Sequence, residues 1–183
     1  MVSYKLKSKV EDFLVNEVSL WPDLCPREFS QFTYIRVKKV GMTTFEALDK
    51  IRQFFRLGYS DVSKQGLKDE DAITYQLIAV KSILLAEDIS RFNRKFAVSC
   101  PLLKIVDLFG YGKEPLKSRL LHGNVFKVTI RNLDKSAVNL LYNFCFKNRF
   151  FTFINYYDSQ RFGVAGGHYN THLIGKAIVE NDW

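Results

Sequence analysis

The sequence has few of the features that mark secreted, membrane-bound or metal-rich proteins. Its 183 residues include three cysteines, Cys25, Cys100 and Cys145, which are far apart and odd in number. They fit neither a disulfide framework nor a metal cluster, and they favour a reducing compartment. No apolar run reaches the roughly 18 residues of a membrane span, and the N-terminus lacks the apolar core of a signal peptide. We therefore expect a cytoplasmic protein without a membrane partner.

Patterns of metal, nucleotide and hydrolase sites are missing as well. His168 and His172 are four residues apart, but neither an HExxH glutamate nor a third ligand accompanies them. Gly175 and Lys176 lack the preceding glycine spacing and the following Ser or Thr of a phosphate-binding loop. No Ser-His-Asp order can be defended. We therefore expect no metal site.

Basic and aromatic residues, by contrast, are abundant. The chain has 27 Lys and Arg against 19 Asp and Glu, a net charge of +8, which favours a polyanionic partner. The alternative is a solvated surface with a cationic bias. Most of the 16 Phe and 9 Tyr rings must belong to the core, but exposed ones can stack RNA bases. The hydrophobic fraction of 47% predicts a globular domain.

Periodicity predicts an α+β fold. The helix expected over residues 43–57 begins with the capping-box spacing of Thr43 and Glu46, and Gly58 ends it. Because most strands alternate polar and apolar residues, we expect a mixed, largely antiparallel sheet with helices packed on one face. We expect strands over residues 9–18, 31–40, 61–65, 102–112 (running into a glycine-bounded loop) and 123–132, a strand or a helix over 75–85, and a helix over 137–146 capped by Asp134.

The strand expected over residues 123–132 has two different faces. Its alternation predicts a half-buried strand with a basic exposed side. The apolar side consists of Phe126, Val128 and Ile130, and the other side consists of Lys127, Thr129 and Arg131.

An acid-rich turn between two apolar runs is the most informative segment. Its sequence is GLKDEDAITYQ, from Gly66 to Gln76, and Lys68 and Asp69 follow closely on the glycine. A carboxylate beside a lysine on a glycine-led turn is a candidate catalytic or ligand position. The alternative is a solvated turn in which Asp69 pairs with Lys68.

Four strings, in order along the chain, resemble the TruD family of tRNA pseudouridine synthases. One is the turn itself, which matches the family pattern G-x-K-D-x-x-A-x-T-x-Q. The segment 171–183 also resembles a helix that follows in archaeal and eukaryotic-type members. The other three strings are EDFLVNE (11–17), LLHGNVFKVTIRN (120–132) and NYYDSQRFG (155–163).

The resemblance implies the chemistry. Members of the family isomerise a uridine of tRNA, by family expectation at position thirteen of the D-arm, to pseudouridine without cofactor or metal. One aspartate is essential, and the pattern places it at Asp69. A carboxylate suits this role as a nucleophile or as a base at the sugar. The target base must leave its stack to reach it.

The resemblance also implies substrate-binding residues. It places Phe13 in a wall of the pocket and matches Asn155 to the uridine-contacting asparagine, whose amide can donate and accept hydrogen bonds. Ordinary strand packing and a turn-forming role are their respective alternatives. Lys68 and Tyr157 complete the substrate-binding set, Tyr157 standing where the family has Phe. Asp158 replaces a glycine of the family pattern, which counts slightly against activity.

The resemblance finally implies an incomplete domain. In the family, an inserted domain separates two sequence halves of the catalytic domain, and residues 1–183 correspond to the N-terminal part. We expect a sheet with an unpaired edge and a partly uncovered apolar face, hence self-association or a complementing C-terminal half as partner. Three hypotheses remain: an enzyme active when completed, as one half of a split enzyme; a non-catalytic RNA-binding remnant; and a basic interaction domain.

Overall fold

The computed structural model describes residues 4–148, 150, 152, 154 and 171–181. The chain divides into two units, Met1–Asp134 and Lys135–Trp183. Each unit is described by itself.

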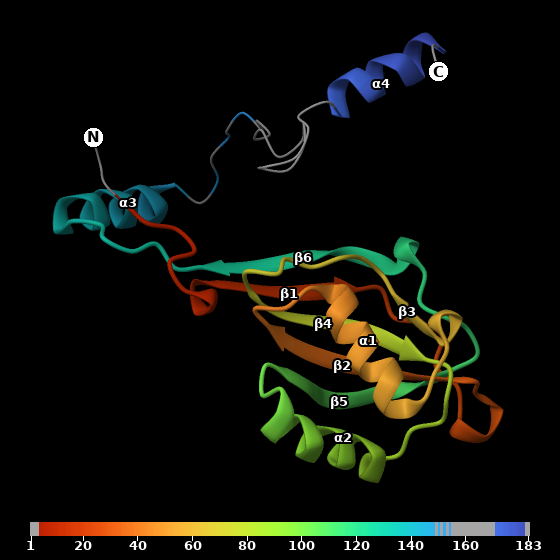
Figure 1. The fold of residues 1–183 in the computed structure, drawn as a ribbon. Helices are drawn as coiled ribbons and strands as arrows, with labels where there is room; N and C mark the ends of the chain where they lie inside the picture. The colour runs from red at the N-terminus through yellow and green to blue at the C-terminus, as the bar shows by residue number, and fades with distance from the viewer. Residues whose placement is uncertain (1–3, 149, 151, 153, 155–170, 182–183) are drawn as a thin grey trace. The chain divides into compact units, whose positions relative to one another are not determined.

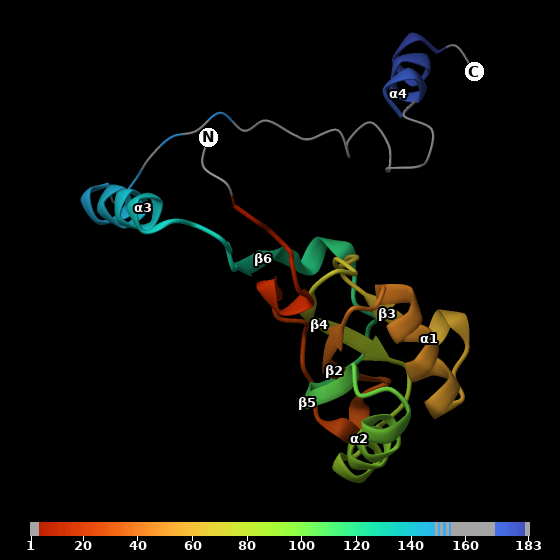
Figure 2. The same ribbon diagram turned by 60° about the vertical axis from the view of Figure 1, so that its left-hand side comes forward.

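The first unit is built around a six-stranded mixed sheet (Figures 1 and 2). Its strand order is β5-β2-β4-β1-β6, and β3 pairs with the last residues of β4. β1 and β4 are parallel, whereas the other neighbouring strands are antiparallel. The predicted mixed, largely antiparallel sheet is confirmed. The strands are β1 (Phe13–Ser19), β2 (Phe32–Val40), β3 (Val62–Lys64), β4 (Ile73–Val80), β5 (Leu103–Gly112) and β6 (Leu121–Val128).

Two helices, α1 (Thr44–Phe55) and α2 (Ala86–Ser99), cover one face of this sheet. Alternate residues of β2, β4 and β5 point at them, because successive side chains of a strand face opposite sides. This arrangement confirms the prediction that helices pack on one face. The core between the layers consists of Ile35, Val37, Ile78, Val80, Leu103 and Ile105 from the strands, and of Ala47, Leu48, Ile51, Phe92 and Phe96 from the helices.

The opposite face of the sheet is covered only in part. Side chains of the segment between β5 and β6, which contains the short 3-10 helix Ser118–Leu120, pack on one end of it. Tyr34 and Leu77 are buried there against Leu116. The remainder of this face, toward the start of β4, keeps solvent-exposed residues such as Arg36.

Helix α1 begins as predicted and ends differently. The Glu46 amide donates to Thr43 Oγ1 at 3.1 Å, and the Thr43 amide donates to the Glu46 carboxylate at 2.8 Å, so the capping box is confirmed. The helix ends at Arg56 rather than at Gly58. Arg56 adopts the left-handed conformation with φ 56°, and its amide donates to the Arg52 carbonyl.

Several other elements differ from the expectations. The segment 75–85 is a strand only up to Val80. Residues 10–12 form a 3-10 turn, so the first strand starts at Phe13. A loop was expected at the glycines that end β5, but the strand continues to Gly112. Gly110 and Gly112 are packed against the side chains of Leu24 and Tyr34, respectively. A Cβ on Gly112 would be 2.3 Å from Tyr34 Oη.

The second unit contains helices α3 (Lys135–Lys147) and α4 (Thr171–Glu180). The helix predicted over residues 137–146 and the helix expected in 171–183 are thereby confirmed. In the part of the chain that the structure describes, no helix has the length and apolarity required to cross a membrane.

Candidate active site around the Asp69 turn

The Asp69 turn lies between β3 and β4, and its first residues are anchored on β1. The Ser19 hydroxyl donates to the side-chain carbonyl of Gln65 at 2.7 Å. At the turn itself the Asp69 carboxylate is about half exposed. A carboxylate that faces solvent while its backbone is held is suited to meet a substrate.

A buried lysine holds the backbone of this turn. Lys39, on β2, is 0% exposed, and its ammonium donates to the carbonyl oxygens of Met42 and Asp69, both at 2.6 Å. The Lys68 carbonyl lies at 3.4 Å from the same nitrogen. Lys39 therefore ties the Asp69 backbone to the residues that precede α1.

Thr44 supplies a second attachment. Its hydroxyl accepts a hydrogen bond from the Lys68 amide at 3.0 Å and donates to Gln76 Oε1 at 3.2 Å. Thr44 is the first residue of α1, and Gln76 is the last residue of the turn motif. Thr44 therefore links Gln76 to the backbone of Lys68, and both of these residues belong to the turn motif.

Lys68 forms an ion pair beneath the turn. Its ammonium is 2.6 Å from Glu17 Oε2, and the two side chains are only 3% and 1% exposed. The other Glu17 oxygen accepts a hydrogen bond from the Leu77 amide at 3.0 Å. The alternative in which Asp69 pairs with Lys68 is not what the structure shows, because Lys68 pairs with Glu17 and Asp69 lies near Lys7. In this geometry the ion pair between Lys68 and Glu17 holds the turn in place. The predicted contact of Lys68 with the substrate would require the Lys68 ammonium to reach solvent.

We expect Lys39→Met to lower the free energy of unfolding by about 2–4 kcal/mol, because it leaves buried carbonyl oxygens without donors. Lys38→Met is the matched control. It removes the neighbouring ammonium, which points to the opposite face of the sheet, and should change stability by no more than about 0.5 kcal/mol. Urea denaturation of both variants measures the difference. Equal effects would show that Lys39 does not clamp the turn.

The pH dependence provides a second readout. Burial lowers the pKa of Lys39 from 10.5 to about 8, while the charges of Asp69 and Glu70 act in the opposite direction. Between pH 8 and 10.5 the unfolded chain holds a proton that the folded chain has released, so stability rises with pH. This rise should be absent from Lys39→Met.

Phe13 and Asp69 both lie next to the side chain of Lys7. The Lys7 ammonium is 3.7 Å from Asp69 Oδ1 and 4.0 Å from the centre of the Phe13 ring. Phe13 also stacks on Phe126 with ring centres 5.7 Å apart. The structure therefore brings Phe13 and Asp69 to the same place. Lys7 could not be predicted as a neighbour of Asp69, because nothing in the sequence distinguishes it from the lysines around it.

A third ion pair joins two of the motif strings. Asp12 is 1% exposed, and its carboxylate accepts hydrogen bonds from the Arg131 guanidinium at 2.6–2.9 Å. These bonds hold the pKa of Asp12 below its usual range. The side chain of Arg131, expected on a basic exposed face, is 40% exposed, and its guanidinium is paired with the buried carboxylate of Asp12. Phe126, Val128 and Ile130 are between 45% and 54% exposed, as expected for an apolar face that is only partly covered.

Asn155 and Tyr157, the other two expected substrate-binding residues, lie outside the described residues, as does Asp158. Their roles remain predictions.

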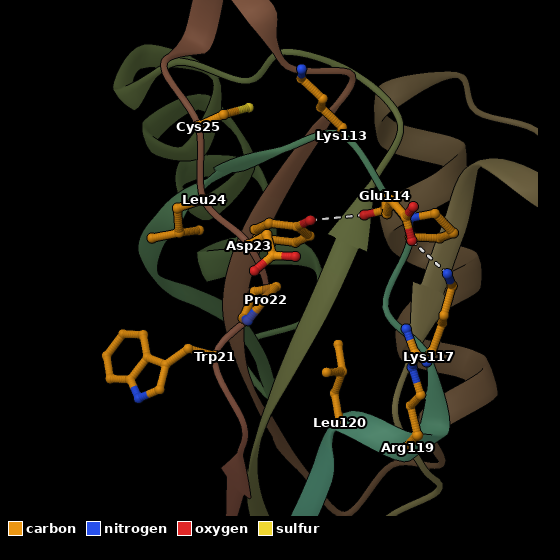
Figure 3. Close-up of a pocket in the computed structure, with 12 residues that line it drawn as sticks. Trp21, Pro22, Asp23, Leu24, Cys25, Lys113, Glu114, Lys117, Arg119 and Leu120 are labelled. Atoms are coloured by element: carbon orange, nitrogen blue, oxygen red, sulfur yellow. Dashed lines mark hydrogen bonds and ion pairs between the residues drawn. The ribbon is translucent and has the colours of Figure 1, made fainter.

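A hollow of about 430 Å³ lies away from the Asp69 turn (Figure 3). It separates the segment after β1, which carries Trp21 and Asp23, from the segment that precedes β6, which carries Lys117 and Arg119. Neither Phe13 nor Asp69 lines it. This hollow is therefore not the candidate active site, despite its volume.

The fold is shared with a solved structure. The crystal structure of a TruD protein from Methanosarcina mazei matches 97% of this chain and 38% of its own, with a TM-score of 0.71 and 22% identical residues. At the level of sequence, the family model for tRNA pseudouridine synthase D (TruD) matches residues 2–183. The chain belongs to the TruD family.

Curated relatives agree with this membership. The tRNA pseudouridine synthase D of Syntrophotalea carbinolica is 30% identical over 180 residues, which are 97% of this chain and 41% of the relative. The human pseudouridylate synthase 7 homolog is 31% identical over 164 residues, which are 86% of this chain and 22% of the relative. The chain thus spans less than half the length of these relatives.

Proposed function

We propose that this chain is the aspartate-bearing part of a tRNA pseudouridine synthase. The supporting observation is the Asp69 turn. A half-exposed carboxylate sits beside the ring of Phe13 on a backbone that Lys39 holds from below. The family resemblance implies an essential carboxylate next to an aromatic wall of the substrate pocket, and this arrangement fits that expectation. The uridine would belong to tRNA, with position thirteen of the D-arm as the family expectation, and the work would take place in the cytoplasm.

The proposed reaction conserves every atom of the uridine. The bond between uracil N1 and ribose C1′ breaks, and a bond between C5 and C1′ forms. C5 then loses its proton and N1 gains one. Asp69 acts at the sugar, as a nucleophile toward C1′ or as a base on the ribose. In either role the residue must carry a charge, and its half-exposed position leaves room for the ribose to approach.

Phe13 is proposed to stack on the base once the base has left the RNA helix. The Lys7 ammonium now lies over that ring and would be displaced toward Asp69 or a phosphate. Asn155 and Tyr157 are proposed as further contacts to the uridine. Lys68 is better explained as a positioning residue, since its charge is paired with Glu17 and buried.

Residues 1–183 are proposed to be the N-terminal part of a catalytic domain that a second segment completes. β6 is an edge strand of the sheet. Its apolar side chains, which a core would normally cover, are exposed by about half: Val125 by 56%, Phe126 by 54% and Val128 by 46%. An unpaired edge beside such side chains favours addition of a strand. The added strand could come from a complementing half or from a second copy of the chain.

A complementation assay tests this function. The chain is incubated with tRNA under single-turnover conditions, with and without the remaining segment of a related family member, and pseudouridine is quantified. We expect little product from the chain alone and clear product from the mixture, because a segment that binds only the folded state stabilises that state. Light scattering on the same samples reports self-association. Absence of pseudouridine from a mixture that forms a stable complex would contradict the proposal.

A further inference from the structure

A row of side chains, polar or basic except for Val125 at its end, crosses the helix-free face of the sheet. Cross-strand partners lie on the same face of a sheet, so the register defines the row directly. It runs from β5 through β2, β4 and β1 to β6, and its members are Lys104, Lys38, Tyr75, Asn16 and Val125.

Two lysines of this row directly oppose each other. Lys38 on β2 pairs in register with Lys104 on β5, and like charges in this position repel each other. Next to them Arg36 is engaged by Asp107, so that acid is already occupied. No described residue forms an ion pair with Lys38 or Lys104. An anion between the two ammonium groups would relieve their repulsion.

An aromatic hollow borders the row. Its volume is about 300 Å³, and its lining includes Trp21, Phe109 and Tyr75, with Leu77 and Arg36 beside them. Trp21 is 73% exposed, and its ring leans on Phe109 with centres 4.8 Å apart. The tryptophan is therefore held from one side and leaves much of its surface to solvent. Such a ring is a platform on which a nucleic-acid base can stack.

The stacking rings of this surface lie on the opposite face of the sheet from the Asp69 turn, although Glu17 and Gln76, which help to hold that turn, also line the hollow. Tyr75 and its neighbour Thr74 point to opposite faces of β4. Thr74 pairs in register with Lys39, the lysine that holds the Asp69 carbonyl. The Asp69 turn therefore lies on the helix-covered side of the sheet, and the row with Tyr75 lies on the other side.

We propose that the helix-free face of the sheet is a binding site for single-stranded RNA. Trp21 and Tyr75 stack bases in the hollow, and Lys38 and Lys104 bind the phosphates that flank them. An open sheet that carries the exposed ring of Trp21, the half-buried ring of Tyr75 and two lysines outside any described ion pair matches the way in which sheet surfaces bind single strands. A protein partner fits less well, because lysine is depleted from the cores of protein interfaces. Duplex RNA offers paired bases that cannot enter the hollow.

Trp21 makes the test direct. Trp21 and Trp183 are the two tryptophans of the chain, so Trp183→Phe leaves Trp21 as the single reporter. A short oligouridylate is titrated into this protein, and the fluorescence of Trp21 is followed at two salt concentrations. We expect quenching that saturates and weakens with salt, since each phosphate contact contributes a slope of about 0.7 in log K against log salt. A duplex of equal length should quench weakly.

Variants made in this single-tryptophan protein separate the two kinds of contact. Tyr75→Ala should weaken oligouridylate binding by about tenfold, and Tyr75→Phe, which keeps the ring, should restore it. Lys38→Glu combined with Lys104→Glu should weaken binding at least tenfold and flatten the salt slope by about 1.4. Lys95→Glu, which makes the same charge reversal at a single site on helix α2, is the control and should have little effect. Circular dichroism checks that each variant is folded.

The outcome is independent of the proposed catalysis. Asp69→Asn should leave oligouridylate binding unchanged, because Asp69 lies on the other side of the sheet. Quenching by duplex and single strand alike, or equal losses in Lys95→Glu and the double lysine variant, would overturn the assignment. So would tight binding that survives Tyr75→Ala together with loss of the two lysine charges.

Discussion

Asp69→Asn is expected to abolish pseudouridine formation by the completed enzyme, with a loss of at least about a thousandfold in the single-turnover rate. The substitution keeps the shape of the side chain and removes its charge, so neither a nucleophile nor a base remains at the sugar. The turn should keep its conformation, because Lys39 and Thr44 hold its backbone rather than the carboxylate. Pseudouridine quantified in tRNA, together with the thermal midpoint of each protein, measures both effects.

The same turn supplies the control. Asp71→Asn removes an exposed carboxylate two residues away and makes an identical chemical change. We expect it to leave the rate within a few-fold of that of the unchanged protein. If the two variants were equally active, or if Asp69→Asn unfolded the protein, the assignment of Asp69 as the catalytic residue would fail.

The local parts of the fold were predictable from the sequence because local residues determine them. The capping box of Thr43 and Glu46 spans four residues and lies at its expected place. Helix α2 was not predicted, although Phe92 and Phe96 recur at helical spacing, because a leucine rather than a typical capping residue precedes it. The glycines of β5 look like loop residues in sequence. Only the position of Tyr34 over Gly112 explains why a strand needs a glycine there.

The site could be predicted only at the positions that a motif marks. The family motifs predict that Asp69 and Phe13 belong to one site, and the structure places both residues beside Lys7. It could not identify Lys39. A lysine in an alternating strand looks like a solvent-facing residue, and its burial depends on a turn thirty residues away. The ion pair of Lys68 could not be identified for the same reason, since its partner Glu17 is distant in sequence.

In this structure, two ion pairs with buried carboxylates connect motif strings of the family. Glu17 of the first string pairs with Lys68 of the second, and Asp12 of the first pairs with Arg131 of the third. Both acids are buried on or just before β1, which lies between β4 and β6. The two ion pairs therefore tie the Asp69 turn to β1 and the segment after β6 to the 3-10 turn that precedes β1. A large part of the motif therefore holds the backbone that carries the Asp69 carboxylate.

Lys68→Met should for this reason lower the free energy of unfolding by about 3–5 kcal/mol, the range found when one partner of a buried ion pair is removed. Glu17 would then be a buried charge without its counter-ion. Glu17→Gln keeps the oxygen that accepts from the Leu77 amide and removes only the charge. Combined with Lys68→Met, it leaves no buried charge, so the double variant should be more stable than Lys68→Met alone. Urea denaturation of the four proteins completes the double-mutant cycle.

An exposed ion pair on the same molecule provides the control. Lys117 pairs with Glu114, and their side chains are 46% and 67% exposed. Lys117→Met should therefore change stability by less than about 1 kcal/mol, since water already solvates both charges. Losses from Lys68→Met and Glu17→Gln that simply add would mean that the two charges do not depend on each other. The buried pair could then not be what holds the Asp69 turn against β1, and the attachment would rest on Lys39 and Thr44 alone.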